Sequence, residues 1–147
     1  MSLKQYQTKR KFSNTPEPKG EVNKKSLLRY VVQEHQARNL HYDFRLEIKG
    51  VLKSWAVPKG IPTQAGIKRL AVQVEDHPVD YIDFTGVIPK GEYGAGVVKI
   101  WDKGKYKIID GELRRGSFKF ELSGKKLGGN YVLVRLKVKK NWLIYKI

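Results

Sequence analysis

The chain has 147 residues, of which 40% are hydrophobic and 11% aromatic, enough for one domain with a buried core and too many for a disordered protein. It contains no cysteine, which excludes disulfides and thiolate metal sites, so any bound metal must use nitrogen and oxygen ligands. No apolar run reaches the length of a membrane span, and the N-terminus has no hydrophobic stretch of the signal-peptide kind. We therefore expect a soluble, cytoplasmic monomer that does not enter a membrane.

The formal net charge of +16 is unevenly distributed along the chain. Residues 34–83 carry seven basic and seven acidic side chains, whereas residues 1–33 carry eight and two, and residues 84–147 carry fifteen and five. A basic exterior around a charge-balanced middle favours a polyanionic partner, above all nucleic acid, held around a site with its own electrostatics. A lysine-rich surface that serves only solubility or growth at high temperature is the alternative interpretation.

Residues 1–25 are rich in Lys, Ser, Asn and Pro, and they predict an irregular basic arm in front of a single domain over residues 26–147. No later stretch of ten residues has a helical period, so we expect an all-β fold, a compact small β-barrel with few short helical turns. Loops rich in Gly and Pro, 58–66 and 88–96, should border a cleft. The expected strands are 27–34, 40–48, 51–57, 69–75, 97–101, 105–109, 117–122, 130–138 and 141–146.

The strand expected over 40–48 carries the clearest chemical signal. Alternate residues of a strand share a face, so His41, Asp43 and Arg45 point one way with neighbours about 6.6 Å apart. The intervening residues Leu40, Tyr42, Phe44 and Leu46 form a core face. If the preceding strand pairs nearby, His35 completes a site of two histidines and one carboxylate. Such a site suits Mn²⁺, Fe²⁺ or Zn²⁺ and leaves coordination positions open for a substrate.

A phosphate-binding group is expected next to this site. Arg45 lies one strand step beyond the ligands, where its planar fork can hold a phosphate through two hydrogen bonds. His77 follows the strand 69–75, in which Leu70, Val72 and Val74 should face the core. His77 could act as a general acid or as a donor that stabilises developing charge on the phosphate, and Tyr81 offers a hydroxyl near the same edge.

Other interpretations of these residues stay open at this point. A single histidine is usually a surface or core residue, Glu75-Asp76 could be a solvated turn, and Lys59 and Arg69 could be surface charges. The order His41-x-Asp43 followed by His77 also fits a non-haem iron oxygenase that uses a 2-oxo acid. A non-catalytic nucleic-acid-binding module with structural histidines is a third interpretation.

Four sequence blocks, taken in order, resemble one known family. They are 35–45, 50–60 (Gly-Val-Leu-Lys-Ser-Trp-Ala-Val-Pro-Lys-Gly), 74–81 and 86–96 (Gly-Val-Ile-Pro-Lys-Gly-Glu-Tyr-Gly-Ala-Gly). The chain resembles the 3′-phosphoesterase domain that stands at the N-terminus of bacterial DNA ligase D and occurs alone in archaea and bacteria. This resemblance implies a compact β-barrel and a Mn²⁺-dependent enzyme, with Co²⁺ or Zn²⁺ as other possible metals.

The resemblance also implies roles for individual residues. It makes His35, His41 and Asp43 the metal ligands and places Arg45, His77 and Tyr81 around the scissile phosphate. The further substrate-binding residues that it implies are Gln33, Lys59, Arg69, Glu75, Glu17 and Arg10. One position departs from the family pattern, because Arg10-Lys11-Phe12 stands where the family has Arg-Asp-Phe. This change leaves open the balance between diesterase and monoesterase activity.

The expected function is therefore healing of 3′ ends. The enzyme would remove a terminal 3′ ribonucleoside from a primer strand by phosphodiester hydrolysis and then remove the remaining 3′-phosphate. Its expected partners are primer-template DNA with a 3′ ribonucleotide or 3′-phosphate and a DNA ligase or primase-polymerase that uses the repaired end.

Overall fold

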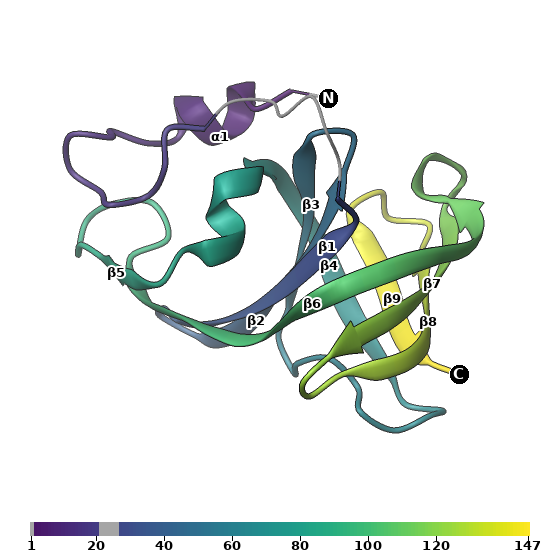
Figure 1. The fold of residues 1–147 in the computed structure, drawn as a ribbon. Helices are drawn as coiled ribbons and strands as arrows, with labels where there is room; N and C mark the ends of the chain where they lie inside the picture. The colour runs from purple at the N-terminus through teal and green to yellow at the C-terminus, as the bar shows by residue number, and fades with distance from the viewer. Residues whose placement is uncertain (1, 21–26) are drawn as a thin grey trace.

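The computed structural model describes residues 2–20 and 27–147 (Figure 1). Three short helical segments occur in this part of the chain: α1 (Lys4–Thr8) and the 3₁₀ turns η1 (Val79–Asp83) and η2 (Leu113–Arg115). No helix in these ranges is long and apolar enough to cross a membrane. The strands are β1 (Arg29–Gln36), β2 (Leu40–Ile48), β3 (Val51–Val57), β4 (Lys68–Pro78), β5 (Gly86–Ile88), β6 (Gly96–Glu112), β7 (Ser117–Gly124), β8 (Gly128–Arg135) and β9 (Asn141–Lys146).

Eight of these strands close into an antiparallel barrel, which confirms the all-β prediction. The order around the barrel is β1-β2-β3-β4-β9-β8-β7-β6, and β6 returns to pair with β1, while β5 adds to β6 outside the ring. Closure leaves no unpaired sheet edge within the ring.

Two expected strands, 97–101 and 105–109, are one continuous strand, β6. Gly104 does not break it, because a glycine there lets the β7 backbone approach where a Cβ would lie 2.1 Å from the Ser123 oxygen.

The barrel interior is filled by one face of each strand. Phe44, Trp55 and Trp142 are essentially inaccessible to solvent and belong to one continuous hydrophobic cluster. Phe44 and Leu46 face this core as expected. The expectation was wrong for Leu40, which begins β2 at the rim of the barrel and is half exposed.

A second hydrophobic cluster lies on the outer face of the barrel wall. Tyr6 from α1 is fully buried there against residues of β1, β3 and the segment that begins at η1. The Tyr6 hydroxyl donates to the Pro18 carbonyl at 2.5 Å, which ties the helix to the returning chain. Figure 1 shows α1 and η1 on the same side of the sheet. The arm is therefore not irregular throughout, and part of the predicted arm and the boundary at 25/26 lie outside the described residues.

A β-bulge in β4 decides which of its residues face outward. Leu52 of β3 pairs with His77 and Ser54 pairs with Val74, so β4 has one extra residue between these pairs. Val74 and His77 consequently face the same side, although strict alternation would place them on opposite sides. The prediction that Leu70, Val72 and Val74 face the core was wrong. Ala71 is the core residue, while Leu70 is exposed and Val74 lines an outer cavity.

Candidate active site

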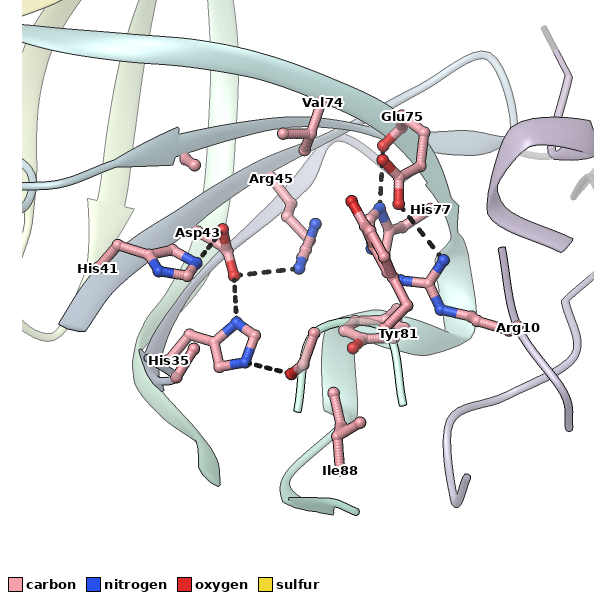
Figure 2. A pocket seen from close by; sticks show the side chains of 14 residues that line it. Arg10, His35, His41, Asp43, Arg45, Val74, Glu75, His77, Tyr81 and Ile88 are labelled. Carbon is pink, nitrogen blue, oxygen red and sulfur yellow. Dashed lines mark hydrogen bonds and ion pairs between the residues drawn. The ribbon is translucent and has the colours of Figure 1, made fainter. Parts of the chain in front are cut away.

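A cavity of about 280 Å³ lies on the outer wall of the barrel, beneath the arm and the segment that follows β4. The strands β1 to β4 contribute its floor, since their outward-facing side chains converge there. Figure 2 shows these side chains together with Arg10 from the arm. The predicted site residues that line the cavity are Arg10, His35, His41, Asp43, Arg45, Glu75, His77 and Tyr81.

Three of the lining residues form a candidate metal site at one end of the cavity. His35 and His41 are direct cross-strand partners on β1 and β2, so their rings lie 4.7 Å apart between centroids. His35 Nδ1 lies 3.3 Å from one oxygen of the Asp43 carboxylate, and His41 Nε2 lies 3.2 Å from the other. One ligand atom from each residue falls within 4.8 Å of the other two. The register of the β1–β2 hairpin therefore brings the three candidate metal ligands together.

The second nitrogen of each imidazole faces a backbone carbonyl. His35 Nε2 lies 2.7 Å from the Gly94 oxygen, and His41 Nδ1 lies 3.1 Å from the Asn39 oxygen. A carbonyl only accepts hydrogen bonds, so these nitrogens carry the ring protons in the neutral tautomers. The nitrogens that face Asp43 then hold lone pairs directed at a carboxylate, an arrangement that a cation between them stabilises. Carbonyl-bonded histidines of this kind are typical metal ligands.

The electrostatics of the candidate metal site favour binding of a cation. Burial alone would raise the pKa of Asp43, but the Arg45 guanidinium first, and then hydrogen bonds from His35 and His41 when the nitrogens that face it are protonated, hold this pKa well below its usual range. The hydrogen bond to Asp43 raises the pKa of His41, against an opposing effect of burial. Either a proton on His41 or a bound metal ion can balance the negative charge of the Asp43 carboxylate.

Arg45 is held rigidly next to Asp43 with one donor group left over. Its Nε donates to Gln33 Oε1 at 2.7 Å, and Gln33 in turn donates to the Tyr81 and Phe84 carbonyls. One terminal nitrogen lies 3.5 Å from Asp43. The other, Nη1, is buried and has no hydrogen-bond partner in the described part of the chain. An unpaired buried guanidinium nitrogen is costly unless a ligand accepts from it, so it indicates an anion-binding position.

His77 lies at the other end of the cavity, where its surroundings favour the neutral imidazole. Its Nδ1 donates to the Glu75 carbonyl at 2.9 Å, so Nε2 is free to accept from Arg10, whose Nη2 lies 3.4 Å away. Burial first, and then the charges of Arg45 and Arg10, lower the pKa of His77 well below its usual value. The ring packs against Tyr6 and Tyr81 at centroid distances of 5.0 and 4.7 Å.

The lowered pKa of His77 predicts a dependence of stability on pH. The unfolded chain binds a proton at this residue below about pH 6.5, whereas the folded chain does not, so its contribution to the free energy of unfolding should fall as the pH drops below that value. Urea unfolding between pH 5 and 8 measures the slope. In His77→Gln, which cannot titrate, the slope over this window should be smaller, and an unchanged slope would contradict the neutral assignment.

The arm reaches the site through Arg10. Its Nε donates to the Glu17 carboxylate at 2.9 Å, and its Nη1 donates to Glu75 at 3.3 Å. The Tyr81 hydroxyl also donates to Glu17, at 2.7 Å. Burial and Glu17 raise the pKa of Tyr81 despite the nearby Arg45, so the hydroxyl remains a donor. Glu17 and Gln33 therefore lie behind the cavity lining and position the groups that line it.

Two predicted site residues lie away from this cavity. Lys59 is exposed after the end of β3, and Arg69 donates to the Lys59 and Gly60 carbonyls, so neither side chain lines the cavity. The predicted cleft loop 58–66 is likewise absent from the lining, whereas Ile88, Tyr93 and Gly94 of the loop 88–96 contribute to it.

The structure adds contacts that the sequence did not single out. Tyr6 packs on His77, and Gly94, with a φ of 76°, presents its carbonyl to His35. The glycine-rich composition of loop 88–96 indicated a cleft border but gave no reason to select one carbonyl. The arrangement does not favour the iron-oxygenase alternative, because His77 contacts Arg10 and Glu75 rather than joining the ligand set of His41 and Asp43.

The fold and the site together define an antiparallel β-barrel that carries a candidate metal site beside a buried arginine, one of whose nitrogens has no hydrogen-bond partner among the described residues. Residues 33–135 match the family described as the DNA Ligase D 3′-phosphoesterase domain. The chain belongs to this family, which confirms the resemblance seen in its sequence.

Several curated proteins are similar to nearly the whole chain. It is 50% identical, over 98% of its length, to the multifunctional non-homologous end joining protein LigD of Pseudomonas aeruginosa. It is 46% identical to the protein of that name from Mycolicibacterium smegmatis and 43% identical to the multifunctional non-homologous end joining DNA repair protein LigD of Mycobacterium tuberculosis, over 99% of its length in both cases. It spans only 18% to 20% of the length of these relatives.

Proposed function

We propose that this protein is a hydrolase that heals 3′ ends of nucleic acid strands, with Mn²⁺ as its metal. It removes a 3′-terminal ribonucleoside as a phosphodiesterase and then the 3′-phosphate as a phosphomonoesterase. Membership of the 3′-phosphoesterase family supports the reaction class, and the basic flanks support a nucleic acid substrate.

The observation that carries the proposal is that one ring nitrogen of His35 and one of His41 face the Asp43 carboxylate, beside an Arg45 nitrogen without a hydrogen-bond partner in the described part of the chain. His35, His41 and Asp43 offer nitrogen and oxygen donors that suit Mn²⁺, and Co²⁺ or Zn²⁺ as well. Arg45 Nη1 offers a buried donor next to them that has no hydrogen-bond partner within residues 2–20 and 27–147. A cation site and an anion site within one small cavity suit a phosphate ester, which binds to both.

The residues of the cavity have distinct roles in this proposal. A bound divalent ion supplies polarisation of a phosphoryl oxygen and a lower pKa for bound water. Arg45 holds the phosphate and neutralises the charge that develops on it. His77 either protonates the leaving oxygen or donates to the phosphate, and in both roles it must first gain a proton. A bound phosphate favours that proton by its negative charge.

The proposal is tested with a 5′-labelled primer that ends in one ribonucleotide, annealed to a longer template. With Mn²⁺, the labelled primer should first become shorter by one nucleoside, leaving a 3′-phosphate. It should then lose this 3′-phosphate. Chelation should stop both steps, and added Mn²⁺ should restore them. The absence of any metal-stimulated release would contradict the proposal and favour a non-catalytic nucleic-acid-binding module.

We further propose that the 3′-hydroxyl ends made here are used by a DNA ligase or a primase-polymerase. The relatives are described as multifunctional end-joining proteins, although this chain spans only about a fifth of their length. Incubation of a duplex whose nick carries both a 3′-phosphate and a 5′-phosphate with this protein and a separate ligase should yield a sealed product. Sealing at the same rate without this protein would contradict the coupling.

Lys11 is the residue that departs from the family pattern, and its position in the structure allows its effect on activity to be predicted. The residue is exposed, whereas the side chain of its neighbour Arg10 is only 5% exposed. Because its side chain does not line the cavity of the candidate active site, Lys11→Ala should change both the diesterase and monoesterase rates by less than about threefold. Separate rate constants from the labelled-primer assay check this, and a large loss of only one activity would assign Lys11 to the substrate.

A further inference from the structure

A second cavity, of about 780 Å³, lies beside the candidate active site along β4. Val74, Glu75 and Tyr93 line both cavities, so the two adjoin. Figure 2 shows Val74 and Glu75 away from the end of the site that holds His35 and His41. We call the second cavity the β4 groove; it is lined by Ser2, Lys4, Gln5, Lys9, Lys53, Val72, Gln73, Val74, Glu75, Asp76, Tyr93 and Lys140.

The β4 groove has an excess of positive charge. It is lined by four lysines and two carboxylates, and each carboxylate is paired: Glu75 with Lys9 at 3.2 Å and Asp76 with Lys53 at 3.1 Å. The other two lysines, Lys4 of α1 and Lys140 of the β8–β9 turn, are exposed and form no ion pair within residues 2–20 and 27–147. Lysines from two separate elements, α1 and the β8–β9 turn, that line one polar groove suit an extended polyanion.

We propose that the β4 groove binds the phosphodiester backbone of the strand whose 3′ end lies in the active site. The inference rests on the proposed function and adds the direction in which the strand leaves the site. Hydrolysis at the terminal linkage releases a nucleoside, which carries no phosphate, whereas the upstream strand carries one phosphate per nucleotide. The upstream strand is therefore the part of the substrate that the lysine-lined β4 groove would bind.

The continuity of the backbone also favours binding of this strand, rather than the complementary strand, in the β4 groove. Successive phosphates of one strand are separated by about 3.4 Å along the helix axis, so the backbone that follows the bound 3′ end must enter a space that adjoins the site. The β4 groove adjoins it at Glu75 and Tyr93. The complementary strand has no such requirement, because its backbone lies across the duplex.

Binding measurements test the charge argument. The probe is a fluorescent primer-template duplex made only of DNA and ending in a 3′-hydroxyl, on which the enzyme has no group to remove. Anisotropy gives its affinity over a range of salt concentrations. The double variant Lys4→Ala with Lys140→Ala should bind about tenfold more weakly or worse at 0.1 M salt, and its salt slope should be smaller by about 2.

A matched control removes the same charge elsewhere. Lys107 and Lys125 are exposed on β6 and at the β7–β8 turn and line neither cavity. Replacing both with alanine should leave affinity within about twofold of the wild type. Equal losses in the two double variants would show that only general surface charge matters and would overturn the proposal, as would unchanged binding by the groove variant.

Cross-linking tests which strand occupies the groove. The chain has no cysteine, so Lys140→Cys provides one thiol for a photoactivated cross-linker, and Lys107→Cys provides the control. Lys140→Cys should label the strand with the 3′ end, within its last several nucleotides, and the control should label it weakly. Labelling of the complementary strand alone would overturn the proposal.

The two proposals fail in different measurements. Failure of the proposed function appears as no release of nucleoside or phosphate by the wild-type chain. Failure of the groove assignment appears in binding and cross-linking to an unreactive duplex, which need no turnover.

Discussion

Replacing His41 with alanine is expected to abolish Mn²⁺ binding and to reduce both proposed esterase rates by about a thousandfold or more. His41 supplies one of three donor atoms of the candidate metal site, and the several kcal/mol of transition-state stabilisation that a bound metal provides would be lost with it. Its side chain is 24% exposed, so its removal leaves no large cavity in the core. Calorimetric titration with Mn²⁺ and the labelled-primer assay measure the two losses.

A neighbouring substitution controls for damage to the strand. Leu40 precedes His41, and its side chain is half exposed at the rim of the barrel. Leu40→Ala should therefore keep both Mn²⁺ affinity and turnover close to wild type. Full activity of His41→Ala would rule out the assignment of this residue as a ligand.

Replacing His77 with glutamine is expected to reduce turnover by about 10²- to 10⁴-fold while Mn²⁺ still binds. The range is that of a lost general acid or charge-stabilising donor. His77 contacts Glu75 and Arg10 and lies apart from the candidate ligands, so the metal affinity should not change. Single-turnover rates and calorimetry on the same sample separate the two effects.

The pH dependence of the reaction distinguishes a chemical role of His77 from a structural one. If His77 gives or shares a proton in the reaction, the wild-type rate should follow one ionisation that is missing in His77→Gln. Asp80→Asn, at an exposed position of η1, should retain the wild-type profile. Loss of Mn²⁺ binding in His77→Gln would show instead that the residue supports the metal site.

The contrast between His41 and His77 follows from where the barrel places them. His41 lies at the rim on β2, opposite His35, whereas His77 follows the bulge of β4 and is packed under the arm. Two histidines with opposite electrostatic surroundings result: the pKa of His41 is raised by its hydrogen bond to Asp43, and that of His77 is lowered by burial and two arginines.

The sequence by itself determined the all-β class and the outward face of β2. Strand alternation is a property of the backbone, so the spacing of His41, Asp43 and Arg45 was enough to place them on one face. The absence of cysteine was enough to restrict a metal site to nitrogen and oxygen donors. These features depend on residue type and local spacing alone.

Only the tertiary structure decided the rest. The β1–β2 register that sets His35 opposite His41, the extra residue that turns His77 toward the cavity, and the carbonyls that fix both imidazole tautomers are invisible in a pattern of residue types. Arg10 reaches Glu75 across 65 positions of sequence. Register, bulges and long-range ion pairs depend on how the closed barrel and its arm pack, and packing is a property of the whole fold.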